Sequence, residues 1–184
     1  MQTSGVFFTI VSGAILTLSV FAEPRRWTAS PAAPVADTPL QRAGISAYSF
    51  QRGTTSYFKN CGGCHGLHGE SVPENIPTLR GFVGYFTKFQ EGRAYLVQVP
   101  GVANSPIRDN EELADVLNFV VMEFGSNSMA PDFQPFTAAE VAELRKDPII
   151  SNLRAYRTRL VSKILRDEGL PPSADRYSAG PGHN

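Results

Sequence analysis

The sequence predicts an all-α fold, built of helices around a segment that contains both cysteines of the chain. Apolar residues recur at helical intervals in five segments of the chain. These segments are 45–60, 93–99, 110–124, 137–146 and 149–167. In 110–124, the side chains of Leu113, Val116 and Leu117 form one stripe, two glutamates occupy the first turn, and Gly125 follows the end. No βαβ pattern surrounds the cysteines, so helices are their expected neighbours.

Several of the helical segments also have recognisable capping residues or breaks at their ends. Asn110 can cap the helix over 110–124, and Thr137 can cap the next one, with Glu140 completing a capping box. Pro148 separates that helix from residues 149–167. The first helix, residues 45–60, is expected to deliver the two cysteines to the functional site.

The segment Cys61-Gly62-Gly63-Cys64-His65 carries the chemistry of the chain. Cys-x-x-Cys-His is the pattern of covalent haem attachment, in which each thiol forms a thioether to one porphyrin. The two glycines let the backbone turn close to the ring, and the histidine that follows is placed to ligate the iron.

Three other interpretations of the motif are open on sequence alone. A thioredoxin-like redox pair requires a βαβ setting, which is missing here. A zinc site requires four ligands, and His65 and His68 are too close to the cysteines to complete a relaxed tetrahedron. A disulfide between Cys61 and Cys64 would close a small strained loop and leave the histidine unexplained.

Residues 60–84 resemble the class I c-type cytochromes. After the cysteine motif comes Pro77-Thr78-Leu79-x-Gly81-x-x-Gly84, which is similar to the family's Pro-Asn-Leu-x-Gly-x-x-Gly run. The resemblance implies a cytochrome c-like helical fold around one haem c, to which residues 149–167 would add a further C-terminal helix. It also implies that the Pro77 carbonyl accepts a hydrogen bond from His65, and that Leu79 packs on the haem face. An ordinary loop proline and a plain core leucine are the alternatives.

The sixth iron ligand is expected to be Met129, in the Gly/Ser/Pro loop after residue 124. A thioether there favours reduced iron, which suits electron transfer. The alternative for Met129 is an adaptable apolar filler, and Met122 lies inside a helix, off the apolar stripe. In the family the methionine loop precedes the last helix. Here that region contains Asn104-Ser105-Pro106-Ile107 and no methionine, which departs from the family pattern.

Composition and the N-terminal segment bear on location and partners. The chain has 184 residues, seventeen basic and seventeen acidic, and is 42% apolar, which indicates a globular protein without the basic surface of a nucleic-acid binder. The uncharged apolar run 6–22 predicts a cleaved signal peptide or a membrane anchor. The expected organisation is a signal peptide at 1–22, a Pro/Ala-rich leader at 23–44, a cytochrome c domain at 45–168 and a disordered tail at 169–184.

The sequence therefore predicts a periplasmic monohaem cytochrome that carries single electrons between redox proteins, such as a donor dehydrogenase and an acceptor oxidase or cytochrome. No catalytic constellation stands out, so an enzyme is not expected. The alternatives are a haem subunit of an exported dehydrogenase, or a gas-binding sensor if Met129 does not ligate the iron. The basic residues of 149–167 predict either a docking surface or a solvated helix face, and they are Arg154, Arg157, Arg159, Lys163 and Arg166.

Overall fold

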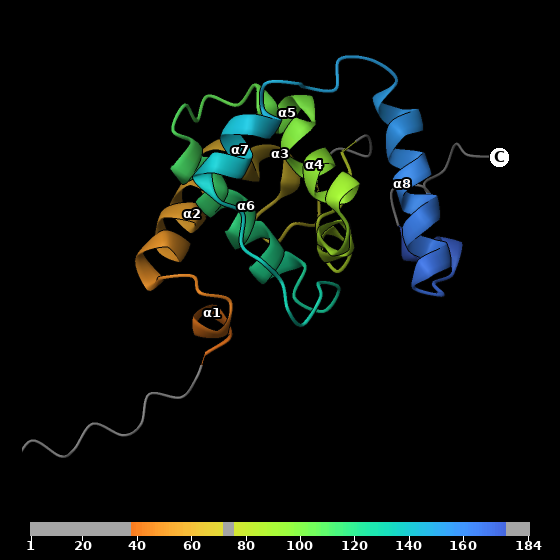
Figure 1. Ribbon diagram of the computed structural model, residues 1–184, viewed down its shortest axis with the longest axis horizontal. Coiled ribbons are helices and arrows are strands. Elements are labelled where there is room, and N and C mark those ends of the chain that lie inside the picture. Colours follow the sequence, from red (N-terminus) through yellow and green to blue (C-terminus); the bar gives the residue numbers. More distant parts are fainter. Residues whose placement is uncertain (1–37, 72–75, 176–184) are drawn as a thin grey trace, which may run out of the picture. The chain divides into compact units, whose positions relative to one another are not determined.

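The computed structural model describes residues 38–71 and 76–175, all of them in the unit Ala36–Asn184 (Figure 1). The elements in chain order are α1 (Pro39–Arg42), α2 (Ala47–Asn60), α3 (Gly62–His65), the 3-10 helix η1 (Val83–Lys88), α4 (Gln90–Gln98), α5 (Pro100–Ala103), α6 (Asn110–Phe124), α7 (Ala138–Leu144), α8 (Leu153–Asp167) and the 3-10 turn η2 (Pro172–Ala174). No strand occurs in these described ranges, and the all-α prediction is confirmed.

The predictions for the N-terminal segment mostly concern residues outside the described ranges. The expected signal peptide at 1–22 and most of the leader at 23–44 lie outside the described residues. The end of the leader forms α1, where Thr38 caps the helix in a full capping box. Among the residues that the structure describes, no helix is long and apolar enough to cross a bilayer.

Helix boundaries follow the local capping residues. Helix α6 covers the predicted range, but its cap is Asp109, whose carboxylate accepts a hydrogen bond from the backbone N of Glu111 at 2.9 Å. Helix α2 begins after its cap Ser46, and α7 after the predicted cap Thr137. Helix α8 begins later than predicted, because Asn152 takes a left-handed conformation with φ 53° immediately before it.

Helices α2 and α6 cross in close contact, and this crossing positions the cysteine motif. A Cβ on Gly53 would lie 2.2 Å from the Asp115 carbonyl oxygen, so the two backbones approach too closely for a side chain there. Beside the crossing, the Arg52 guanidinium binds the Asp115 carboxylate at 2.6 Å. The rings of Tyr57 and Phe119 pack 5.3 Å apart, one turn nearer to the motif.

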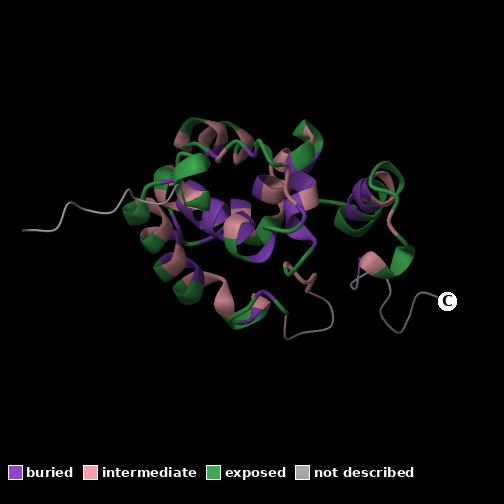
Figure 2. Cartoon of the chain, turned by 90° about the horizontal axis from the view of Figure 1, so that it is seen from below, coloured by how far each residue is buried: buried purple, intermediate pink, exposed green. Residues whose placement is uncertain are grey.

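The main core lies around α6, which is buried along most of its length (Figure 2). Its members come from α2, η1, α4, α6, α7 and the connections between them. They include Ile45, Tyr57, Val83, Val97, Ile107, Leu113, Val116, Leu117, Phe119, Val120, Val121, Phe124, Phe133, Phe136 and Val141. Helix α6 is therefore the central element, rather than one of several equal helices.

A second cluster joins α8 to η1 and α4. Leu160, Val161 and Ile164 pack there against aromatic side chains that include Phe86 and Tyr95, whose rings stack 5.1 Å apart. Helical spacing also predicts Ile149 and Leu153 on the inward stripe of this helix. However, Ile149 precedes α8, and Leu153 lies at its start and is 36% exposed.

The segment after α8 is held by an ion pair. The Arg157 guanidinium binds both oxygens of the Asp175 carboxylate at 2.7 and 2.8 Å, and both side chains are buried. Residues 170–175, the start of the expected tail at 169–184, are held against α8 in this way, and residues 176–184 lie outside the described residues.

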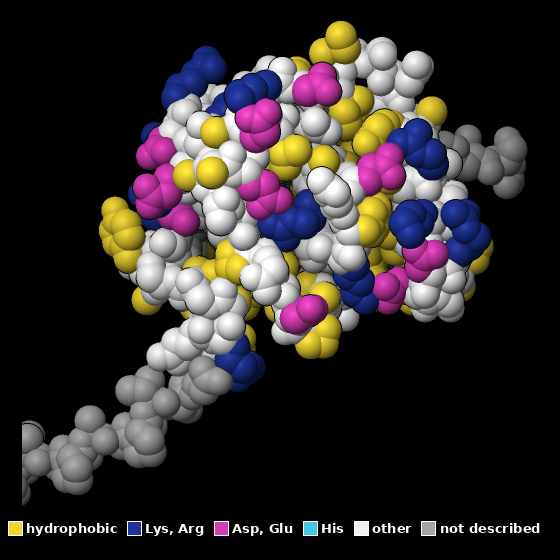
Figure 3. Space-filling view, viewed as in Figure 1, with side chains coloured by type: hydrophobic (Ala, Val, Ile, Leu, Met, Phe, Trp, Pro, Cys, Tyr) yellow, Lys and Arg dark blue, Asp and Glu magenta, His cyan; other side chains and the backbone are white. Residues whose placement is uncertain are grey.

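The basic residues of α8, for which the sequence predicts either a docking surface or a solvated helix face, are largely paired with acidic residues. Arg157 is buried against Asp175, Arg159 binds Glu91, and Lys163 binds Asp167. Figure 3 shows Lys and Arg side chains interspersed with Asp and Glu over one face of the molecule. A docking surface that depends on Arg157 is excluded by its burial.

Candidate functional site

The single helical turn α3 carries Cys64 and His65, and Cys61 precedes it as the residue that links α2 to α3. The Cys61 carbonyl accepts hydrogen bonds from the backbone N of Cys64 at 3.1 Å and of His65 at 3.0 Å. Cys61 is half-buried, Cys64 is exposed, and both are free thiols. One turn of backbone at the end of α2 therefore presents two sulfurs and an imidazole together.

The environment of Cys61 separates the motif from a redox-active dithiol. Burial, with a smaller electrostatic contribution from the neighbouring Cys64, raises the pKa of Cys61 to about 11. Reactive Cys-x-x-Cys thiols have pKa values lowered to ~3.5–7.5 by positive surroundings. A thiol that stays protonated at neutral pH is a poor nucleophile for disulfide exchange, which disfavours the thioredoxin-like alternative.

The hydrogen bonds around His65 define which ring nitrogen is available to a metal. The Ser71 hydroxyl donates its one hydrogen to the Pro77 carbonyl at 2.7 Å and lies 3.4 Å from Nδ1 of His65. The Ser71 hydroxyl oxygen and the Pro77 carbonyl oxygen can therefore only accept hydrogen bonds from the His65 ring. Nδ1 of His65 then carries the proton, and Nε2 has the free lone pair. Burial lowers the pKa of His65, and the Pro77 carbonyl acts in the opposite direction. The imidazole is therefore neutral near pH 7, the form that binds iron.

The loop that carries Pro77 is attached to the C-terminal end of α6. The backbone N of Gly81 donates to the Phe124 carbonyl at 2.7 Å, and that of Leu79 donates to the Gly69 carbonyl at 2.8 Å. A Cβ on Gly69, whose φ is +70°, would lie 2.8 Å from the Phe124 ring. The Pro77 loop, which lies beside His65, is thus fixed to the C-terminal end of α6.

The main core that Cys61 packs on has a half-exposed apolar border. Its members come from several segments and include Leu79 in the Pro77 loop, Leu96 on α4, Val102 on α5 and Met129 after α6. A planar apolar group held by two thioethers needs walls of this kind from several directions. With a neutral imidazole on the same turn, these residues can hold a haem, and His65 can ligate its iron.

The two candidate methionines lie at or beyond the C-terminal half of α6. The backbone N of Met129 donates to the Gly125 carbonyl at 2.9 Å, and a Cβ on Gly84 would lie 2.5 Å from that same N. Met129 is thus held beside the loop that continues from Pro77, whereas Met122 lies inside α6. Both side chains are half-buried and pack on the main core.

Polar contacts fix the chain that follows Met129. The Asn118 side chain forms two hydrogen bonds with the backbone of Phe136, at 2.7 and 3.0 Å. Arg93 donates to the Gln134 carbonyl at 2.7 Å and binds Glu140 through two nitrogens. The connection from α6 to α7 therefore has a defined path over the core.

Two functional candidates that sequence reasoning missed are Ser105, in the connection before α6, and Arg145, which binds that connection from the end of α7. The hydroxyl of Ser105 is the buried side-chain polar atom for which no hydrogen-bond partner exists among the described residues. Arg145 binds both sides of this connection, donating to the Ala103 carbonyl and to the Asn110 side chain at 3.1 Å each. The sequence showed that a methionine is missing here, but only the fold shows that Ser105 is buried.

Ser71 was also missed from sequence. Its backbone is in the left-handed region, with φ 63°, and this conformation turns the hydroxyl between His65 and Pro77. A serine in a Gly/Pro-rich loop gives no sequence signal of that role.

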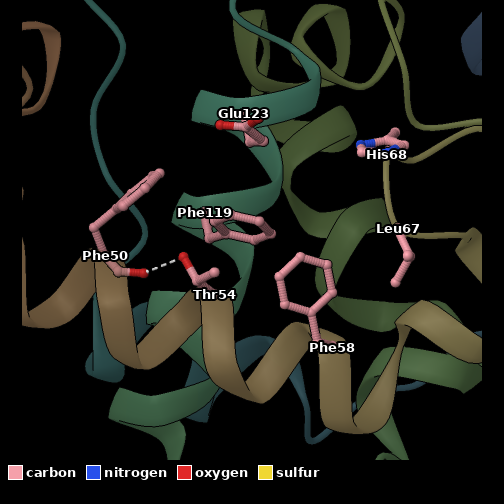
Figure 4. Close-up of a pocket in the computed structure, with 7 residues that line it drawn as sticks. All are labelled: Phe50, Thr54, Phe58, Leu67, His68, Phe119 and Glu123. Carbon is pink, nitrogen blue, oxygen red and sulfur yellow. Dashed lines mark hydrogen bonds between the residues drawn. The ribbon is translucent and has the colours of Figure 1, made fainter.

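A separate apolar groove of about 550 Å³ lies on the outer side of the α2–α6 crossing (Figure 4). It is lined by Phe50, Thr54 and Phe58 of α2, Phe119 and Glu123 of α6, and Leu67 and His68. Figure 4 shows Leu67 and His68 on the segment that follows the motif. The groove contains neither cysteine of the motif nor His65, so it adjoins the candidate site without being part of it.

Comparison with known proteins agrees with this geometry. A family model described as Cytochrome c matches residues 50–122, which span most of α2 and nearly all of α6 and stop before Met129. Cytochrome c-552 of Thermus thermophilus is 30% identical over 105 residues, covering 48% of this chain and 80% of the relative. Cytochrome c-552 from a named strain of the same species is also 30% identical over 105 residues, covering 48% of this chain and 71% of that relative. No solved structure gave a significant match.

Proposed function

The chain belongs to the cytochrome c family, and on this premise we propose that it is an exported monohaem carrier of single electrons between redox proteins. The family binds haem c covalently, and Cys61 and Cys64 have the required spacing. The observation that carries the proposal is the arrangement at His65, where Ser71 and Pro77 occupy Nδ1 and leave Nε2 for the iron.

Each group of residues has a definite part in this proposal. The haem, when bound, supplies the one-electron chemistry. Cys61 and Cys64 hold it covalently, and His65 provides the proximal ligand. The Ser71 hydroxyl and the Pro77 carbonyl fix the imidazole orientation and raise its basicity. Half-exposed apolar walls such as Leu79 exclude water from the ring.

Location and partners are inferred from sequence. The apolar run 6–22 supports export to the periplasm, either with cleavage after residue 22 or with retention as an anchor. The partners are then redox proteins of that compartment, a donor dehydrogenase and an acceptor oxidase or cytochrome. Intact mass of the exported protein tests the location, since a cleaved signal removes the first 22 residues or so, and a mass retaining Met1 contradicts cleavage.

The carrier proposal is tested by the attachment of the haem and by its redox behaviour. After acid denaturation and extraction with organic solvent, the haem should stay with the polypeptide, and a Cys61→Ala, Cys64→Ala double variant should release it. The intact protein should accept and return one electron per chain in a reversible titration. Haem that is extracted from the parent protein, or a titration that is irreversible, would contradict the proposal.

Two assignments of the sixth iron ligand compete. In the first, Met129 ligates the iron through its thioether, as expected for an electron carrier. In the second, the protein leaves the position open and the haem binds a small molecule. The second is favoured by one observation: the connection before α6, where the family carries its methionine loop, has no methionine.

Replacement of the methionines decides between these assignments. If Met129 is the ligand, Met129→Ala should lower the reduction potential and let carbon monoxide bind the reduced protein, which the parent should resist. Met122→Ala is the matched control, because it removes a half-buried apolar contact and should affect mainly stability. A parent protein that binds carbon monoxide freely, with Met129→Ala unchanged, rejects Met129 and supports the open position.

A further inference from the structure

Tyr57 is fully buried near the end of α2, in a cluster of rings that are otherwise phenylalanines. Its ring centroid lies 5.5 Å from that of Phe58, 5.3 Å from Phe119 and 5.2 Å from Phe124. A phenylalanine could form each of these contacts, so packing alone does not account for the hydroxyl. That hydroxyl donates to the Gly66 carbonyl at 2.8 Å, and burial raises the pKa of Tyr57, which keeps the phenol protonated as a donor.

Tyr57 is bonded to both ends of the cysteine motif. Its backbone carbonyl accepts a hydrogen bond from the backbone N of Cys61 at 2.8 Å, and its hydroxyl reaches Gly66, the residue after His65. Gly66 has a φ of +76°, and a Cβ there would lie 2.4 Å from the Glu70 carboxyl carbon, so the chain turns here on a glycine. We call the two bonds of Tyr57 the Tyr57 clamp.

The clamp acts on a histidine whose backbone is bonded on both sides. The backbone N of His65 donates to the Cys61 carbonyl at 3.0 Å, and its carbonyl accepts from the backbone N of Ser71 at 2.9 Å. The Tyr57 hydroxyl connects this turn to the aromatic core between α2 and α6. Without the hydroxyl, the Gly66 carbonyl loses its partner and the turn can open at the His65 end.

We propose that the Tyr57 hydroxyl positions His65, and that it keeps the imidazole in one orientation toward the iron in both oxidation states. This role rests on the proposed function, in which His65 ligates the iron. The Ser71 and Pro77 oxygens raise the basicity of the imidazole only while Nδ1 stays directed at them. A turn that opens at Gly66 loosens this arrangement. The less basic imidazole then stabilises ferric iron less, so the reduction potential should rise.

Native-state hydrogen exchange of the holo-protein tests the clamp by comparing Tyr57→Phe with Thr87→Val. Each variant removes a buried hydroxyl that donates to a backbone carbonyl, and that of Thr87 donates to Gly84 at 2.7 Å, outside the motif. In Tyr57→Phe, the amides of residues 64–66 should exchange about tenfold or more faster than in the parent, beyond any change at the amides of α6. In Thr87→Val, exchange at residues 64–66 should change no more than at α6.

The reduction potentials of the same two variants test the effect on His65. Tyr57→Phe should have a higher potential than the parent, and Thr87→Val should keep the parent value. A purely structural role would lower stability in both variants and leave both potentials unchanged. Exchange in Tyr57→Phe that is accelerated equally at the motif and at α6 overturns the clamp. An unchanged potential in Tyr57→Phe overturns the positioning of His65.

Measurements on the parent protein separate the remaining outcomes. Its amides at residues 64–66 should be protected nearly as well as those of α6. If they exchange as fast as an open loop, the inference is wrong, even where Tyr57→Phe fails to fold. Haem that acid and organic solvent extract from the parent rejects the proposed function, and the positioning role then falls with it. The exchange results do not depend on covalent haem, so they report on the clamp in either case.

Discussion

The close backbone contact between α2 and α6 predicts the effect of adding one methyl group at Gly53. An ideal Cβ there would lie 2.2 Å from the Asp115 carbonyl oxygen, 2.6 Å from the Asp115 carbonyl carbon and 3.2 Å from Cβ of Phe119. Ordinary contact begins at 3.4 Å, so Gly53→Ala requires α2 and α6 to separate by about 1 Å. The obstructing atoms belong to helix backbone, which cannot rotate out of the way.

The expected loss of stability follows from two opposing terms. Overpacking costs typically ~1–3 kcal/mol, and the upper end applies because separation also disturbs the Arg52–Asp115 ion pair and the Tyr57–Phe119 contact. Alanine is about 1 kcal/mol better than glycine inside a helix, which offsets part of this. The net destabilisation should be about 2 kcal/mol, equivalent to a fall in Tm of roughly 4–8 °C for a domain of this size.

Calorimetry of the holo-protein measures this change, and Gly101→Ala provides the matched control. Gly101 lies in α5, and a Cβ there meets nothing within 4 Å, so its Tm should stay unchanged or rise slightly. Because the crossing places the cysteine motif, Gly53→Ala should also reduce the yield of haem-loaded protein. A Gly53→Ala protein that melts within one degree or so of the parent would refute the close crossing, since overpacking of this kind should lower Tm by several degrees.

Two further substitutions test the contacts that hold distant segments. Asn118→Ala leaves the buried backbone N and O of Phe136 without their partners, so the free energy of unfolding should fall by about 3 kcal/mol in urea denaturation; a loss below ~1 kcal/mol would mean that the α6–α7 connection is not held by this side chain. Arg157→Met removes the guanidinium that binds both oxygens of the fully buried Asp175 carboxylate and should cost ~3–5 kcal/mol, part of which an added Asp175→Leu change should restore. Parent-like stability in Arg157→Met would show that Asp175 escapes to solvent.

Much of the helical pattern could be predicted from the sequence because it depends on local spacing. Helix α6 has its predicted range, since its apolar stripe lies inside the segment and the cap Asp109 and Gly125 adjoin its two ends. Helix α1 and the 3-10 helix η1 were not predicted, because each is short and has too few residues for a periodic pattern. The start of α8 was placed too early, since the left-handed Asn152 is not visible in an apolar pattern.

The sequence by itself determined the attachment chemistry, because Cys61, Cys64 and His65 are neighbours on one turn and need no other segment to be recognised. The tertiary structure alone decided which groups meet across long separations. It assigned Ser71 to His65, attached the Pro77 loop to the end of α6, buried Arg157 with Asp175 and buried the hydroxyl of Ser105. The physical reason is that hydrogen bonding and burial depend on distances between segments, and packing around α6 sets those distances.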